Sequence, residues 1–207
     1  DGINFRNYDS FEGDSDYDKI VSAFNLFIDR SGQIWVYETS GIFLKYNRER
    51  DAFVLYDYFE LQGNPDPVSH FFESEKGILW YADRDLLYHD TINRRFVSYE
   101  FKHKLLDSLT ITSICEDNYN NLWVSTSEGP ICKIETQTGE EIIYNSGQWL
   151  NNANKLYFDS KNTMWLLNNQ SIGTIDLKTM KYEKKYDGFL FTEFRNVFED
   201  ENDNLWF

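Results

Sequence analysis

Short runs in which apolar and polar residues alternate follow one another along the chain, separated by turns rich in Asp, Asn and Gly. This period of two is typical of β-strands with one buried face. The clearest runs contain a tryptophan, and these tryptophans recur at intervals of 45, 43, 42 and 41 residues, at Trp35, Trp80, Trp123, Trp165 and Trp206. A recurrence of this length indicates a structural repeat.

Each repeat is predicted to contain four short strands. Around Trp123, the first strand ends in the apolar pair Ile114-Cys115, the second carries the tryptophan, and the third covers residues 131 to 134. The fourth strand runs from an aromatic residue to a tyrosine a few positions later, as at residues 96 to 99. Complete repeats are predicted at residues 20–58, 66–101, 109–145 and 153–187, with an incomplete repeat from residue 193 and an outer strand at residues 3–8.

Four-stranded units at this period predict an all-β fold, a β-propeller fragment built of four-stranded antiparallel blades. Residues 1–207 are expected to form about four complete blades plus partial blades at both ends. A lone blade cannot bury both of its faces, so the core is expected between neighbouring blades. The five repeat tryptophans are predicted to be core residues, and burying each one contributes at most about 4–6 kcal/mol.

The charge balance argues against some partners. Asp and Glu number 35 against 20 Lys and Arg, a net charge of −15. Nucleic acids and anionic membrane surfaces both require a basic face, so neither is expected to bind this fragment. No apolar run approaches the roughly 20 residues that a membrane span needs. Open blade faces at both ends predict association with a second copy or with the remainder of the same propeller.

The two cysteines, Cys115 and Cys132, are predicted on the first and third strands of one blade. With another strand between them they would lie roughly 9–10 Å apart, beyond the reach of a disulfide. Two buried free thiols are therefore expected.

No metal or cofactor is expected. The turn from Asp200 to Asn204 offers oxygens at positions 1, 3 and 5, like the start of a calcium loop, but a glutamate at position 12 would fall beyond residue 207. His70, His89 and His103 form no zinc-binding pair. Nucleophile, P-loop and dinucleotide motifs are missing, and a carboxylate pair chosen from 35 acids has no specificity. The fragment is therefore predicted not to be an enzyme.

The repeat matches a known pattern. Its best copy reads I-C-E-D at residues 114–117, N-L-W-V-S-T at residues 121–126 and T-G at residues 138–139, and V-F-E-D with N-L-W at residues 197–206 is nearly as good. This pattern resembles the two-component regulator propeller repeat, from about residue 20 onward. Ser74 stands where the family has a turn Asp. WD-repeat and kelch propellers fit less well, because the chain has no Trp-Asp dipeptide and no Gly-Gly pair.

The resemblance implies the periplasmic sensor region of a bacterial hybrid two-component regulator, of the type abundant in Bacteroidetes. Such sensors detect breakdown products of complex glycans and signal across the inner membrane to a histidine kinase elsewhere in the full-length protein. This chain is then expected to sense a glycan-derived oligosaccharide without catalysis. The alternative is a non-catalytic scaffold propeller that dimerises or docks another protein.

Candidate ligand contacts occupy a polar position ten or eleven residues before each repeat tryptophan. These side chains are predicted to ring the mouth of the central channel, where they either hydrogen-bond a sugar or simply solvate the channel. Trp149 lies outside the register of the repeats, and its indole either stacks on a sugar or fills the seam between two blades. The candidates are Trp149, Asn25, His70, Ser113, Lys155, Arg195 and Asn196.

Overall fold

The computed structural model describes residues 23–38, 42–58, 70–82, 85–103, 109–127, 129–144, 153–168, 171–188 and 197–207. These residues form four four-stranded antiparallel sheets and one two-stranded sheet, here named blade 1 to blade 5 in chain order. No helix able to span a membrane occurs in this part of the chain. The outer strand predicted at residues 3–8 lies outside the described residues.

The strands follow the chain from blade to blade. Blade 1 contains β1 (Ala23–Ile28), β2 (Ile34–Glu38), β3 (Ile42–Asn47) and β4 (Ala52–Tyr58). Blade 2 contains β5 (His70–Glu73), β6 (Leu79–Ala82), β7 (Leu86–Asp90) and β8 (Arg95–Ser98). Blade 3 contains β9 (Ile111–Glu116), β10 (Asn121–Thr126), β11 (Ile131–Glu135) and β12 (Glu140–Tyr144). Blade 4 contains β13 (Ala153–Phe158), β14 (Met164–Asn168), β15 (Ser171–Asp176) and β16 (Lys181–Asp187), and blade 5 contains β17 (Phe198–Glu199) and β18 (Leu205–Trp206).

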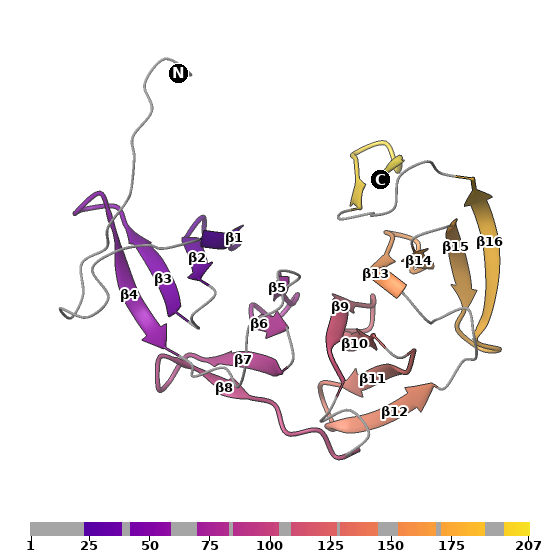
Figure 1. The fold of residues 1–207 in the computed structure, drawn as a ribbon, viewed down its shortest axis with the longest axis horizontal. Coiled ribbons are helices and arrows are strands. Elements are labelled where there is room, and N and C mark those ends of the chain that lie inside the picture. Colours follow the sequence, from indigo (N-terminus) through magenta and orange to yellow (C-terminus); the bar gives the residue numbers. More distant parts are fainter. Residues whose placement is uncertain are drawn as a thin grey trace.

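The blades are arranged side by side in an arc (Figure 1). The first strand of each complete blade (β1, β5, β9 and β13) lies toward the centre of the arc, and the fourth strand lies at its outer edge (Figure 1). Within each blade the strands pair in sequence order, because each turn returns the chain antiparallel to the strand just completed. The predicted all-β propeller fold is thereby confirmed.

The core lies between the blades rather than within one of them. Trp35 of blade 1 packs in one cluster with Leu79 and Tyr81 of blade 2. In the same way Trp80 joins blade 2 to blade 3, and Trp123 joins blade 3 to blade 4. Each of these tryptophans faces the following blade, so burial of a sheet on both faces depends on its two neighbours.

The repeat tryptophans differ in exposure along the arc. Trp35, Trp80 and Trp123 are 3%, 5% and 2% exposed, as expected for core residues. Trp165 is half-buried, with the ring of Phe207 in blade 5 at a centroid distance of 6.0 Å. Trp206 is 62% exposed, contrary to the prediction, because no described element lies beyond the two-stranded blade 5 to cover it.

Apolar side chains are exposed on the first and last blades. Leu26 and Ile28 on β1 are 65% and 58% exposed, and Trp206 and Phe207 in blade 5 are 62% and 45% exposed. Exposed apolar surface of this kind favours association. Association with a second copy or with further blades stays a prediction, which sedimentation at several protein concentrations can decide.

Both cysteines are free and buried, on β9 and β11 with β10 between them. Burial raises the pKa of the Cys132 thiol to about 12 and also raises the pKa of the Cys115 thiol. Both thiols are therefore protonated and unreactive near neutral pH.

The contrast between Trp123 and Trp206 can be measured. Trp123→Ala should lower the free energy of unfolding by about 3–5 kcal/mol, because it leaves a large cavity between blades 3 and 4. The matched substitution Trp206→Ala, at an exposed indole, should cost less than about 1 kcal/mol. Urea denaturation of both variants tests this, and equal losses would contradict the burial of Trp123.

Candidate functional site

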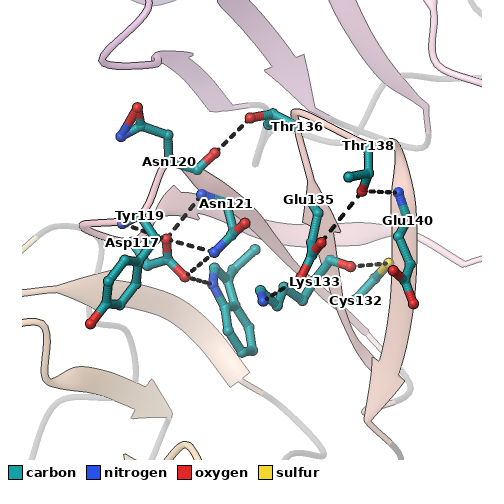
Figure 2. Close-up of polar contacts among 11 residues, drawn as sticks. Asp117, Tyr119, Asn120, Asn121, Cys132, Lys133, Glu135, Thr136, Thr138 and Glu140 are labelled. Carbon is teal, nitrogen blue, oxygen red and sulfur yellow. Dashed lines mark hydrogen bonds and ion pairs between the residues drawn. The ribbon is translucent and has the colours of Figure 1, made fainter.

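In most blades the turn between the first and second strands carries an aspartate that accepts a hydrogen bond from the repeat tryptophan. In blade 3 the indole Nε1 of Trp123 donates a hydrogen bond to Asp117 Oδ2 at 2.9 Å. The second carboxylate oxygen, Oδ1, accepts the backbone N–H groups of Tyr119 and Asn121, both at 2.9 Å (Figure 2). The same indole-to-carboxylate hydrogen bond, at 2.8 to 3.0 Å, joins Trp35 to Asp29, Trp165 to Asp159 and Trp206 to Asp200.

These turns also need a left-handed backbone three residues after the Asp. Gly32 has a φ of 76°, and Asn120, Asn162 and Asp203 have φ values of 63°, 61° and 62°. Gly, Asn and Asp tolerate this conformation better than other residues, which explains why they recur at this position. The acidic turns are thus closed by protein hydrogen bonds, and the calcium-loop pattern at Asp200 reflects the same turn.

Hydrogen bonding sets the charge state of the turn carboxylates. The indole of Trp206 and the side chain and backbone N–H of Asn204 hold the pKa of Asp200 at about 2. For Asp29, burial acts to raise the pKa, but hydrogen bonds from Ser31 and Trp35 outweigh it and the pKa is lowered. Both groups are ionised at neutral pH, which strengthens the hydrogen bonds that they accept.

Blade 2 departs from this pattern. Ser74 occupies the Asp position, and its hydroxyl accepts the backbone N–H of Ile78 at 3.0 Å. It is too short to reach the tryptophan, so the buried Nε1 of Trp80 has no hydrogen-bond partner in the structure. An unsatisfied buried donor costs about 1–3 kcal/mol.

A second acidic residue joins the turns of blades 2, 3 and 5 to the blade before each of them. The carboxylate of Glu73 accepts the backbone N–H of Arg30 at 2.6 Å, and that of Glu116 accepts the N–H of Glu75 at 2.6 Å. Glu199 accepts the N–H of Ser160 at 2.8 Å. These three contacts, here called the interblade latches, connect blades 1 to 2, 2 to 3 and 4 to 5.

Blades 3 and 4 are joined differently. Phe158 stands at the latch position of blade 4 and packs against Trp123, with ring centroids 5.7 Å apart. The backbone N–H of Asn118 instead donates to Asn162 Oδ1 at 2.8 Å. The latches were not predicted from the sequence, although a Glu directly precedes the turn position at residues 73, 116 and 199. That recurrence was the available signal.

Several of the predicted ligand residues cannot be placed. Trp149, Arg195 and Asn196 lie outside the described residues. Asn25 lies on β1, opposite Tyr37 of β2. Its side chain is likewise outside the described part of the chain.

Ser113 is a structural residue, contrary to the prediction. It is fully buried on β9, and its hydroxyl accepts the backbone N–H of Leu156 at 3.0 Å and donates to the Leu156 carbonyl at 3.4 Å. These bonds join the inner strands of blades 3 and 4. A side chain with no exposed surface and both hydrogen bonds taken cannot contact a sugar.

His70 and Lys155 lie at the same position of their blades as Ser113, on β5 and β13. Each pairs with the penultimate or last residue of the second strand, so both lie at the end of the blade opposite the latched turns. Burial, and then the charge of Lys155, lower the pKa of His70 to about 4. Burial also lowers the pKa of Lys155.

The sequence and fold of the chain were compared with those of known proteins. The family model described as "Two component regulator propeller" matches residues 105–128, which include the whole of β9 and β10. The chain contains a two-component regulator propeller repeat. This confirms the family resemblance drawn from the repeat. The comparison with curated proteins found no match.

Solved propellers share the fold. An extracellular domain assigned to the hybrid two component system BT3049 from B. thetaiotaomicron has 21% identity and a TM-score of 0.70, covering 92% of this chain and 27% of that one. Virginiamycin B lyase from Staphylococcus aureus has 14% identity and a TM-score of 0.68, covering 91% and 63%. PorZ of the type-IX secretion system of Porphyromonas gingivalis has 13% identity and a TM-score of 0.61, covering 89% and 30%. The chain spans less than two thirds of each of these proteins.

The missing carboxylate of blade 2 gives a stability test. Ser74→Asp should raise the free energy of unfolding by about 1 kcal/mol, because Trp80 Nε1 gains the acceptor that the other blades have. In a double-mutant cycle with Trp80→Phe, which removes the donor, the gain should disappear. Urea denaturation measures all four proteins, and a gain that persists with Trp80→Phe would show another cause.

The buried imidazole gives a pH test. His70 has a pKa of about 4 in the folded protein and about 6.5 when free. Between these values the unfolded chain binds a proton that the folded protein does not, so stability should fall as pH drops from 6.5 to 4, by up to about 3 kcal/mol. His70→Gln should remove this part of the pH dependence.

The control for this test is His103→Gln, at an exposed histidine. The free energy of unfolding is measured at pH 7, 5.5 and 4.5 for the three proteins. His103→Gln should follow the wild-type curve. If His70→Gln follows it as well, the imidazole is not buried in its neutral form.

Proposed function

We propose that this chain is part of the extracytoplasmic ligand-sensing propeller of a hybrid two-component signal transduction protein, and that it detects a glycan-derived oligosaccharide. The observation that carries the proposal is the two-component regulator propeller repeat at residues 105–128. The likeness in fold to the extracellular domain assigned to BT3049 is consistent with it. Under this proposal the chain lies in the periplasm and its histidine kinase lies elsewhere in the full-length protein.

The two ends of the blades support a sensing role in different ways. At one end, latches such as Arg30 to Glu73 and Ser160 to Glu199 hold neighbouring blades together. At the other end lie the last residues of each second strand, together with His70 and Lys155. Loops placed by a rigid scaffold are where proteins most often bind ligands.

Binding at the loop end would act on the blades as a set. Trp35, Trp80 and Trp123 pack blades 1 to 4 against one another, so a ligand that favours one spacing of the inner strands shifts these blades together. Such repositioning of domains is a signal that needs no chemical step. The chain is proposed to act without catalysis, and its likeness to virginiamycin B lyase, at 14% identity, concerns the fold.

The second candidate is a scaffold propeller that only dimerises or docks another protein. The exposed apolar residues Leu26, Ile28, Trp206 and Phe207 favour it, since they offer surface for a protein partner. The two candidates differ in whether a sugar binds.

A thermal-shift screen against a panel of glycan oligosaccharides tests the proposal. Binding at 100 times Kd stabilises a folded protein by about 2.7 kcal/mol, so one sugar class should raise Tm clearly. The same sugar should protect Trp149 fluorescence, identified by comparison with Trp149→Phe. Mass spectrometry should return the sugar uncleaved.

Each other outcome points to a different function. If no sugar raises Tm, the scaffold becomes the better candidate and a pull-down for a protein partner follows. Cleavage of the bound sugar would instead show an enzyme. A Tm shift with unchanged Trp149 fluorescence would keep the sensor and remove Trp149 from its site.

A further inference from the structure

Lys155 is a cation without a counterion in a strongly acidic protein. The chain carries 35 acidic residues against 20 basic ones. The half-buried Lys133 pairs with Glu135 at 3.1 Å, as a desolvated ammonium is expected to do. Lys155 is also half-buried, yet within the described ranges it makes no hydrogen bond and no ion pair. Its electrostatic neighbours are the protonated thiol of Cys115 and the imidazole of His70.

His70 also leaves a polar atom unused. Its ring hydrogen-bonds to the backbone of Thr112, and this bond favours the charged form, so the ring is the donor and the backbone carbonyl the acceptor. The other ring nitrogen, Nε2, is buried with no partner in the structure. In the neutral imidazole this nitrogen is a hydrogen-bond acceptor. A hydroxyl group that reached this nitrogen would find an acceptor with no other hydrogen bond.

The fold places the two groups at one level of three successive inner strands. His70 on β5 contacts β9 through Thr112, and Ser113 on β9 contacts β13 through Leu156, the residue next to Lys155. The registers His70 to Ala82 and Lys155 to Leu167 put both groups at the end of the blades opposite the latches. The two groups are on either side of β9, and the charge of Lys155 acts on His70 across it.

We propose that Lys155 and His70 form the polar centre of the ligand site and that the oligosaccharide carries an acidic sugar. This inference rests on the proposed sensing function and names the class of glycan. Lys155 Nζ donates to the anionic group, and His70 Nε2 accepts a ring hydroxyl of the same sugar. A uronic acid has both groups on one ring, and so has a sulfated sugar.

The ligand also explains an arrangement that stability alone does not favour. A desolvated ammonium and an unpaired imidazole nitrogen are both unfavourable in the free protein. A bound anion with a neighbouring hydroxyl supplies both partners at once. Removing Lys155 should therefore leave the free protein at least as stable as the wild type.

Matched pairs of oligosaccharides test the proposal by isothermal titration calorimetry. The probes are trigalacturonate and its carboxyl-reduced form, and a sulfated galactan tetrasaccharide and its desulfated form. One acidic probe should bind at least ten times more tightly than its neutral counterpart. Which acidic probe binds identifies the anion as a carboxylate or a sulfate.

Variants then assign the contacts. Lys155→Gln should weaken binding of the acidic probe at least tenfold and leave the neutral counterpart unchanged, whereas Lys155→Arg should retain most of the affinity. His70→Gln should weaken both forms. The control is Lys161→Gln, at a lysine of the same blade whose side chain is 68% exposed, and it should bind as the wild type does.

A measurement on the unaltered protein guards against a variant that fails to fold. Raising NaCl from 0.05 to 0.5 M should weaken binding of the acidic probe and leave the neutral one unchanged. Equal affinity for acidic and neutral forms, or wild-type affinity in Lys155→Gln, would overturn the inference and leave the sensing function intact. Absence of binding by every probe would overturn the acidic-sugar inference, and the wider oligosaccharide screen would then decide the sensing function separately.

Discussion

The hydrogen bond from a repeat indole to a turn carboxylate is the interaction on which every blade except blade 2 depends. A repeat tryptophan fills the space between two sheets, but its N–H must also find a partner there. Asp117 supplies it for Trp123, and does so because the turn that carries it bends through a left-handed residue, Asn120. One carboxylate therefore fixes both the turn and the orientation of the largest core side chain. Blade 2 has the tryptophan without this carboxylate.

Two adjacent acidic residues of the repeat bind different partners. In Glu116-Asp117 the Asp binds the tryptophan of its own blade, and the Glu binds a backbone N–H of the preceding blade. Two negative charges side by side are unfavourable, and burial with the nearby carboxylates of Glu75 and Asp117 raises the pKa of Glu116, although the N–H of Glu75 opposes this. All of these contacts lie at one end of the blades.

The sequence was sufficient for the fold and only partly for the site. The tryptophan period predicted blades, strand order and interblade cores, because these follow from which residues must be buried. It could not show that the Ser113 hydroxyl forms both of its hydrogen bonds with the next blade. Those bonds depend on the backbone of Leu156, which only the fold brings close. Polar character selected His70 and Lys155, but it could not show that His70 Nε2 and the Lys155 ammonium have no hydrogen-bond partner in the described residues. Trp206 was predicted to be buried by analogy with repeats that have a following blade.

Blades 2, 3 and 4 each carry one polar group that binds the preceding blade and one that binds the following blade. In blade 3 the carboxylate of Glu116 hydrogen-bonds to blade 2, and the backbone N–H of Asn118 hydrogen-bonds to blade 4. Both groups belong to the same repeat. A duplicated repeat would therefore already carry the groups that hydrogen-bond to both neighbouring blades. It could be inserted between two existing blades without a new contact surface. The number of blades in such a protein can therefore change through duplication of one gene segment.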